Sequence, residues 1–177
     1  MPIGRILFSI ALKLLCFIHF IGFIVSENHK IDNLDRQIIA ALQQDARTPY
    51  AELAKRVGVS AATVHVRVEK LRQAGIVAAT RAIVNPRALG YDVCCFIGIN
   101  LKSARDYNAA LQRLNELDEV VEAFYTTGHY NIFIKVMTRS IDELHTLLTS
   151  KIQTIDEIQS TETLISLHNP ISRQVMP

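Results

Sequence analysis

The stretch from Thr48 to Gly75, TPYAELAKRVGVSAATVHVRVEKLRQAG, decides the fold of the first part of this 177-residue chain. We predict that Thr48 caps a first short helix with Pro49 at its first position, because proline has no N–H to leave unpaired there. Gly58 then ends that helix, and Ser60 caps a second one. Two short helices separated by a three-residue turn predict a helix-turn-helix.

The second of these helices has one apolar face and one open face. Val64, Val68 and Leu71 repeat at spacings of four and three, so they should share a face and pack on Leu53 and Val57. On the opposite face the outward positions are small or basic: Ala62 and Val66 point away, flanked by Thr63, His65 and Lys70, with Arg67 nearer the buried edge. A small tip with basic flanks suits the major groove of DNA.

A third helix completes this part of the chain. From Ile31 to Gln44 the residues Leu34, Ile38, Ile39 and Leu42 form an apolar stripe. Asp32 can cap this helix, and Asp35 suits its first turn because a carboxylate is stabilised by the helix dipole there. Residues 30–75 therefore predict a three-helix head.

Charge is divided unevenly along the chain. Residues 30–81 hold nine Lys and Arg against five Asp and Glu, a balance of +4, whereas residues 82–177 hold eight against eleven, a balance of −3. Paired amphipathic helices also occur in proteins that never touch DNA. The excess of positive charge in the head favours DNA, because counterion release from phosphates drives such binding.

The second part of the chain has a different pattern. The order strand, helix, strand, strand, helix, strand is predicted over Val93–Leu101, Ala104–Leu117, Val120–Thr127, Tyr130–Met137, Ile141–Ile152 and Ile158–Leu167. This order predicts a ferredoxin-like βαββαβ domain over residues 91–177, and an α+β protein overall. The first strand is apolar on both sides, so we expect a second subunit's sheet to cover the face that the helices leave open.

The remaining segments are a linker and an N-terminal extension. Residues 76–90 begin with the β-rich stretch Ile76 to Val84, which we predict to be a linker strand, and Asn85-Pro86 closes it with a turn. Residues 1–29 contain an apolar run from Ile6 to Val25 that is long enough to cross a bilayer. A membrane anchor and a misplaced start of translation both explain it. We favour the misplaced start and expect no membrane partner.

Catalytic and metal-binding patterns are missing from the sequence. It has no HExxH, no glycine-rich phosphate loop and no metal-spaced set of Cys or His. Cys94 and Cys95 are adjacent, so they should point to opposite sides of a strand and act as small apolar side chains. His65 has two open interpretations: a contact beside the DNA groove, or a solvated flank.

A polar hairpin is the best candidate for a small-molecule site. The stretch Tyr125 to Asn131, YTTGHYN, joins two predicted strands and has hydroxyl and amide groups around Gly128. Glycine permits a backbone conformation that exposes neighbouring N–H groups, so a carboxylate and an amino group could both be held there. A tight hairpin turn with no ligand remains the alternative.

Three stretches of the sequence are similar to one protein family. LDRQIIAALQQDART, AELAKRVGVSAATVHVRVEKLRQAGIV and YTTGHYNIFIKV resemble the Lrp/AsnC (feast-famine) regulators of bacteria and archaea, and the match runs from Ile31 to Pro177. The resemblance implies a cytoplasmic transcriptional regulator with a ferredoxin-like (RAM) domain. It also implies homodimers that pair through their sheets and assemble into octamers, and amino-acid effectors that bind between dimers. No enzyme activity and no cofactor are implied.

The resemblance also assigns sites. It places the groove-entering helix on Ala61 to Ala74. We predict that base edges are read by Ala62, Thr63, His65 and Val66. We predict that phosphates are contacted by Ser60, Arg67 and Lys70. It places the effector loop on Tyr125, Thr126, Thr127, Gly128, His129, Tyr130 and Asn131. Many relatives have an aspartate where this chain has Asn131. We therefore expect further polar contacts to the ligand from Glu157, Gln159, Ser160 or Thr161.

The resemblance is strongest to the asparagine-responsive members. It implies that the chain activates an asparagine synthetase gene, represses its own gene and takes L-asparagine as its effector. Two alternatives remain open at this point: a member of the family with another effector and regulon, or a sensor module that acts on a protein partner.

Overall fold

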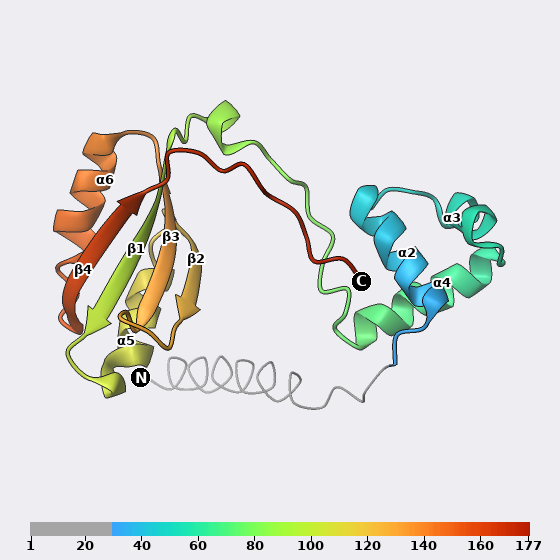
Figure 1. Cartoon of the computed structure of the whole chain (residues 1–177), viewed down its shortest axis with the longest axis horizontal. Coiled ribbons are helices and arrows are strands. Elements are labelled where there is room, and N and C mark those ends of the chain that lie inside the picture. The colour runs from blue at the N-terminus through green and yellow to red at the C-terminus, as the bar shows by residue number, and fades with distance from the viewer. Residues whose placement is uncertain (1–29) are drawn as a thin grey trace, which may run out of the picture. The chain divides into compact units, whose positions relative to one another are not determined.

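The computed structural model describes residues 30–177, and the chain divides into two compact units. One unit, the head, is formed by residues up to Ala82 together with Arg173–Pro177. The other, the sheet domain, spans Ile83–Ser172. Figure 1 labels the helices and strands of both units. The apolar run of residues 6–25 lies outside the described residues. Among the residues described, no helix is both long enough and apolar enough to span a bilayer.

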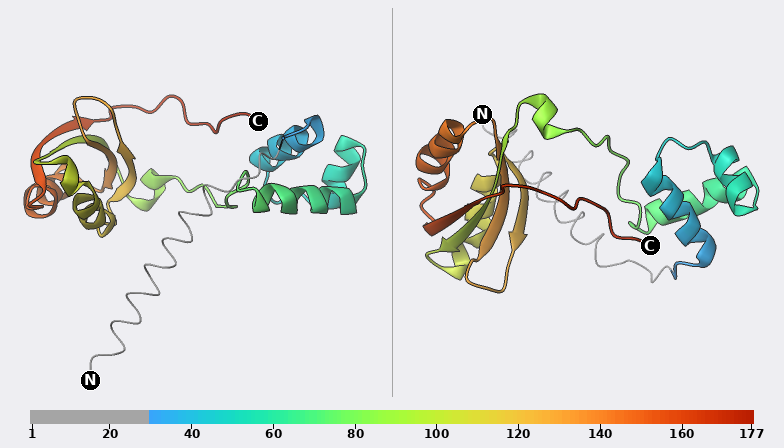
Figure 2. Two further views of the ribbon diagram at one scale, coloured as in Figure 1. Left: turned by 90° about the horizontal axis from the view of Figure 1, so that it is seen from below. Right: turned by 45° about the horizontal axis from the view of Figure 1, so that its top comes forward.

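The head is the predicted bundle of three helices, drawn in blue to green in Figures 1 and 2. They are α2 (Asn33–Gln44), α3 (Tyr50–Val57) and α4 (Ala61–Gln73). Their apolar faces meet in one core, whose fully buried side chains are Ile38, Leu53, Val64, Val68 and Leu71. The predicted packing of α4 on α3 is therefore confirmed.

Local chemistry explains where these helices begin and end. Asp32 caps α2 through a reciprocal capping box with Asp35. The Ser60 hydroxyl accepts a hydrogen bond from the Thr63 N–H at the start of α4. Gly58 ends α3 with φ of 73°, a left-handed conformation that glycine adopts without strain.

The predicted cap of α3 was wrong by one residue. Pro49 is the N-cap, with ψ of 138°, and the helix begins at Tyr50. The Pro49 carbonyl oxygen accepts the hydrogen bonds from Glu52 N and Leu53 N that open the helix. Thr48 makes no cap and is buried instead.

The predicted linker strand was also wrong. No residue between Ile76 and Val84 is in a strand. The Ile83 side chain is 92 % exposed and Val84 is 64 % exposed. A strand needs a neighbour to complete its hydrogen bonds. The predicted turn follows as a short 3₁₀ helix, η1 (Pro86–Leu89), capped by the Asn85 side chain.

The sheet domain has the predicted ferredoxin-like topology. Its strands are β1 (Val93–Leu101), β2 (Val120–Tyr125), β3 (Ile132–Thr138) and β4 (Ile158–Ile165). They lie in the order β2-β3-β1-β4, and every neighbouring pair is antiparallel. The helical segments are η2 (Ala104–Asp106), α5 (Tyr107–Asn115), α6 (Ile141–Leu147) and the π-helical η3 (Leu148–Ile152). Figures 1 and 2 show α5 and α6 on one face of the sheet.

The two faces of the sheet differ in their surroundings. The face toward the helices holds the core, in which Ile97, Ile99 and Ile134 are fully buried. On the other face the Phe96 and Phe133 rings stack with centroids 5.7 Å apart. Leu164, paired with Phe96 in the register, is 47 % exposed. Cys94 is half-buried and Cys95 is buried, as expected of neighbours in a strand.

Candidate DNA interface and effector loop

The outward face of α4 contains the predicted DNA-reading positions. Ala62, His65 and Lys70 are exposed, and Val66 is 52 % exposed although it is apolar. The exposed Ser60 stands at the N-terminal tip, where its hydroxyl lies 2.8 Å from the half-buried Thr63 hydroxyl. A helix that presents small side chains and its own N-terminus can approach DNA closely.

His65 has a partner within the head. Its ring contacts the Tyr50 ring edge-on, with centroids 5.9 Å apart. Tyr50 is the first residue of α3, so this contact joins the two helices of the motif at the surface. The imidazole is therefore exposed with one side against the Tyr50 ring, and both interpretations of His65 stay open.

Arg67 is half-buried, as its predicted position near the buried edge of α4 requires, and it is paired within the head. Its guanidinium contacts the Asp32 carboxylate at 2.6 Å and the buried Asp35 carboxylate at 3.4 Å. The backbone N–H of Asp35 and the Arg67 guanidinium together hold the pKa of Asp32 below its ordinary value of 3.8. This ion pair ties α4 to the start of α2, and the sequence analysis did not predict it; the role of Arg67 as a phosphate contact stays a prediction.

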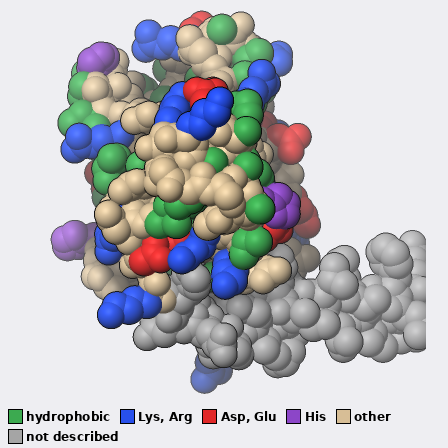
Figure 3. All heavy atoms as spheres, turned by 90° about the vertical axis from the view of Figure 1, so that its right-hand side faces the viewer, with side chains coloured by type: hydrophobic (Ala, Val, Ile, Leu, Met, Phe, Trp, Pro, Cys, Tyr) green, Lys and Arg blue, Asp and Glu red, His purple; other side chains and the backbone are tan. Residues whose placement is uncertain are grey.

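Other basic side chains of the head differ in their pairing. Arg56 pairs with Glu52, and Arg72 pairs with Glu69 at 2.7 Å. Lys70 is exposed and takes part in none of the ion pairs found within residues 30–177. Figure 3, drawn from the head's side, shows Lys and Arg side chains at several places on this face. Lys70 is thus the best placed of the predicted phosphate contacts.

The predicted effector loop is fixed at its ends and exposed in its middle. Asn131 N donates to the Ile99 carbonyl at 2.9 Å, and the Asn131 side-chain oxygen accepts from Leu101 N at 2.9 Å. Thr126 N donates to the Asn131 carbonyl at 3.2 Å. The exposed residues between these anchors are Thr127, Gly128 and His129. The exposed Tyr125 ends β2, and its ring packs edge-on against Tyr107 of α5.

Gly128 does not use the conformation expected of it. The glycines with positive φ among the described residues are Gly58, Gly75 and Gly90. A Cβ added at Gly128 would meet no atom within 4 Å. The turn around Gly128 therefore needs no left-handed residue, and a side chain at this position would meet open space.

The four predicted contacts in and just before β4 differ in their surroundings. Ser160 accepts a hydrogen bond from Asn100 Nδ2 at 3.1 Å. Thr161 pairs in register with the core residue Ile99 and accepts from Gln153 Nε2 at 3.2 Å, so its hydroxyl has a partner outside the loop. Glu157 is half-buried and Gln159 is exposed. Ser160 is linked by its side chain to Asn100, near the end of β1 where Asn131 is anchored, and the Glu157 carbonyl accepts from Lys102 N just after β1 at 3.0 Å.

The sequence analysis missed two residues beside the loop, Glu162 and Gly98, which both contact Tyr130. The Tyr130 hydroxyl donates a hydrogen bond to the Glu162 carboxylate at 2.5 Å, which raises the pKa of Tyr130. The Tyr130 ring lies against Gly98, in the middle of β1. A glycine inside a strand often marks the close approach of another group, and Gly98 could have been found by that signal.

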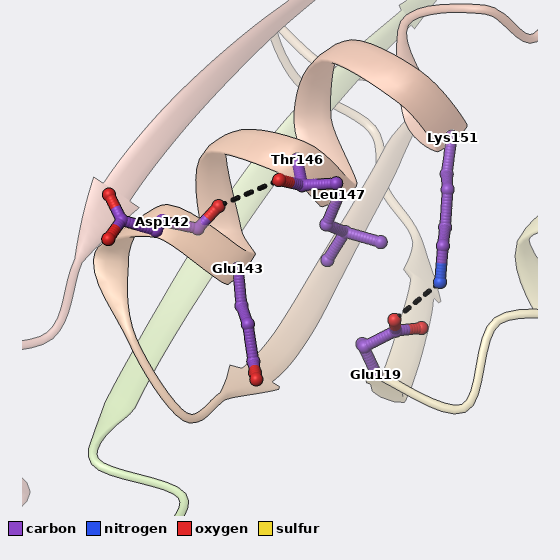
Figure 4. Close-up of a pocket in the computed structure, with 6 residues that line it drawn as sticks. All are labelled: Glu119, Asp142, Glu143, Thr146, Leu147 and Lys151. Atoms are coloured by element: carbon purple, nitrogen blue, oxygen red, sulfur yellow. Dashed lines mark hydrogen bonds and ion pairs between the residues drawn. The ribbon is translucent and has the colours of Figure 1, made fainter.

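The hollows of the sheet domain lie elsewhere. One, of about 270 Å³, is lined by Glu119, Asp142, Glu143, Thr146, Leu147 and Lys151, and Figure 4 shows it between α6, η3 and the start of β2. Lys151 and Glu119 pair across it at 2.6 Å. None of its lining residues belongs to the loop. Within residues 30–177, no group of three or more His, Cys, Asp or Glu side chains could hold a metal ion.

Comparisons with known proteins match both units. The AsnC-type helix-turn-helix domain matches residues 31–72, and the Lrp/AsnC ligand binding domain matches residues 94–176. The chain is 67 % identical over 151 residues to the regulatory protein AsnC of Escherichia coli, a match that covers 85 % of this chain and 99 % of that protein. The chain belongs to the Lrp/AsnC family.

Further relatives agree with this assignment. The chain is 63 % identical over 149 residues to the regulatory protein AsnC of Haemophilus influenzae, covering 84 % of this chain and 99 % of that protein. The solved structure of E. coli AsnC superimposes with a TM-score of 0.82 at 66 % identity, covering 84 % of this chain and 100 % of that one. The leucine response regulatory protein LrpA of Mycobacterium tuberculosis gives 0.72 at 31 % identity, covering 82 % and 99 %. The chain is thus a DNA-binding transcriptional regulator of the Lrp/AsnC family and not an enzyme.

Proposed function

We propose that this Lrp/AsnC regulator reads promoter DNA through α4 and responds to L-asparagine bound at residues 125–131. In this proposal it activates an asparagine synthetase gene and represses its own gene. The observation that carries the proposal is the outward face of α4, on a chain 67 % identical to E. coli AsnC. A protein that acts on promoters in a bacterium works in the cytoplasm, so we propose that location as well.

The roles on α4 follow from exposure and pairing. Ala62, Thr63, His65 and Val66 would meet base edges, since they lie on or beside the open face. Ser60, at the tip, and Lys70 would contact phosphates. Contacts of this second kind set affinity and its dependence on salt, whereas base-edge contacts set sequence preference.

The assembly that we propose is a homodimer, and an octamer built from such dimers. Its support is the apolar character of the sheet face opposite the helices, where Phe124 is 50 % exposed and Leu164 is 47 % exposed. An exposed apolar face of this kind favours coverage by another protein surface. A second copy presents the same face and can pair with it about a two-fold axis.

The deciding experiment is titration of the protein onto the DNA upstream of its own gene, with and without L-asparagine. We expect binding at low protein concentration and a change in affinity when asparagine is added, but no change with glutamine or aspartate. A response to another amino acid would support the alternative that the chain is a family member with a different effector. Asparagine binding without any DNA shift would favour a sensor that acts on a protein partner.

Lys70→Ala tests the phosphate contact. We expect weaker binding to every DNA sequence and a log–log salt slope shallower by about 0.9, the value for one lost phosphate contact on duplex DNA. Arg113→Ala is the matched control, because it removes one exposed positive charge from α5 in the sheet domain. An unchanged salt slope in Lys70→Ala would remove Lys70 from the interface.

A further inference from the structure

Gly98 belongs to a row of three paired residues across neighbouring strands, on the sheet face that the helices leave open. In the register of the sheet it pairs with Phe133 of β3 on one side and with Glu162 of β4 on the other. Because Gly98 has no side chain, this row has a gap between an aromatic ring and a carboxylate. The gap is the feature on which the following steps depend.

The Tyr130 ring fills that gap. A Cβ added at Gly98 would lie 2.6 to 2.7 Å from three carbon atoms of the Tyr130 ring, a distance at which the ring would have to move. The same ring lies 6.0 Å from the Phe133 ring, with 29° between their planes. Every residue larger than glycine at position 98 is therefore incompatible with this position of Tyr130.

The hydroxyl of Tyr130 completes the arrangement. It donates to the Glu162 carboxylate, a charge-assisted hydrogen bond of the stronger kind. Glu162 is exposed, and it stands beside Leu164 on the same face. We call Gly98, Tyr130, Phe133 and Glu162 the tyrosine seat.

The tyrosine seat acts directly on the end of the loop. Tyr130 precedes Asn131, whose backbone and side chain bind the end of β1, and the Tyr130 carbonyl accepts a hydrogen bond from the Thr126 hydroxyl. Seating the ring thus fixes the backbone that closes the loop. A binding loop that is ordered before its ligand arrives loses less entropy on binding, so it binds more tightly.

We propose that Gly98 and Glu162 are positioning residues of the effector loop, which seat Tyr130 and hold residues 126–131 ready for an amino-acid ligand. This inference rests on the proposed function, in which these residues bind L-asparagine. Neither residue needs to touch the ligand. Neither Gly98 nor the exposed Glu162 contributes much apolar contact to this sheet face. Their contacts with Tyr130 explain why a glycine and a carboxylate occupy these positions.

Calorimetric titration of L-asparagine onto the full chain tests this inference. We expect Tyr130→Phe and Glu162→Ala to bind asparagine roughly tenfold more weakly, the effect of losing one hydrogen bond to a charged group. Gly98→Ala, which displaces the ring, should weaken binding at least as much. Glu162→Gln keeps an acceptor oxygen and should restore most of the affinity.

Two controls match these variants. Glu122→Ala removes a carboxylate from β2 at the opposite edge of the sheet, where it pairs with Lys135 at 2.9 Å. Tyr91→Phe removes a tyrosine hydroxyl away from the loop, at a ring that packs under Arg139. Both should bind asparagine as the unsubstituted chain does. Sedimentation and DNA binding without asparagine should be unchanged in all variants.

The outcomes separate this inference from the proposed function. Asparagine binding within twofold of the unsubstituted chain in Tyr130→Phe and Glu162→Ala would overturn the seat while leaving the proposed function intact. Loss of assembly in these variants would also overturn it, since the residues would then serve the subunit interface. If the unsubstituted chain binds no asparagine, the proposed effector fails. Hydrogen exchange at residues 126–131 then decides the seat: faster exchange in both variants supports it, and unchanged exchange overturns it.

Discussion

The head and the sheet domain differ most in what their exposed surfaces offer. The head presents α4 with polar and basic side chains around Ala62 and Val66, on a segment with a net charge of +4. The sheet domain presents aromatic and aliphatic side chains, such as Phe124 and Leu164, on a segment of −3. The first surface is suited to a polyanion and the second to another protein. The two units thus offer surfaces of different chemical character.

The largest effect that we predict tests whether the two units are stable independently. Leu71 and Ile97 are fully buried, one in each core. Truncation of either to alanine should destabilise its own unit by about 2–5 kcal/mol, the usual range for a buried aliphatic side chain. Leu71→Ala should abolish DNA binding and leave asparagine binding intact. Denaturant unfolding, monitored residue by residue by NMR, should show two transitions. Leu71→Ala should lower the denaturant midpoint of the head's transition only.

Ile97→Ala is the reciprocal variant, and it should destabilise only the sheet domain. A single transition shifted equally by both substitutions would contradict the division, because it would mean that the two units unfold together.

A smaller effect concerns Arg67 and Lys70, two of the cationic residues of α4. Arg67→Ala should weaken DNA binding roughly tenfold, because it removes hydrogen bonds to charged groups and frees α4 from α2. Its salt slope should stay unchanged, in contrast to that of Lys70→Ala. Binding measured at several salt concentrations distinguishes the two residues. A slope that falls for Arg67→Ala as well would show that Arg67 is also a phosphate contact.

The order of elements and the cores could be predicted from the sequence, since both follow from local periodicity. Val64, Val68 and Leu71 share a face at helical spacing whatever surrounds them, and they are buried as predicted. The sheet order followed from the βαββαβ pattern, because few topologies satisfy it. The Ser60 cap and the Gly58 turn follow from the chemistry of single residues.

The features that could not be predicted from the sequence depend on contacts between distant residues. Arg67 pairs with Asp32 and Asp35, more than thirty positions away, and helical periodicity says nothing about that. The tyrosine seat joins three strands, through Gly98 of β1, Phe133 of β3 and Glu162 of β4. The stretch from Ile76 to Val84 has the composition of a strand, but strand formation also requires a partner, which its own composition cannot supply.

Each unit has a serine that caps a helix, so the same substitution can be compared in the head and in the sheet domain. Ser60 and Ser140 each accept a hydrogen bond at the start of a helix, from Thr63 N and Glu143 N respectively, both at 3.1 Å. Replacing either serine by alanine should destabilise its own unit by about 1 kcal/mol. Ser60→Ala should also weaken DNA binding, since it frays the tip of α4, whereas Ser140→Ala should leave DNA binding unchanged. Equal loss of DNA binding in both variants would mean that α6 affects the head.

The smallest effect that we predict is a difference between the two units in the pH at which paired carboxylates stop stabilising the fold. The Asp35 backbone N–H and Arg67 lower the pKa of Asp32 from 3.8, and Lys151 lowers the pKa of Glu119 from 4.5. A carboxyl with a lowered pKa stabilises the folded state above its unfolded value, and this contribution disappears as pH falls through the folded value. The sheet domain should therefore begin to lose its contribution at a higher pH than the head.

The pH dependence of single substitutions checks this order. Asp32→Asn keeps a good N-cap while removing the charge. It should be less stable than the unsubstituted chain at pH 7, and the difference should shrink below the ordinary aspartate value of 3.8. Glu119→Gln should show the same convergence in the sheet domain from about 4.5 downward. Differences that persist undiminished at pH 2 would show that packing, and not the paired charge, is what each carboxylate contributes.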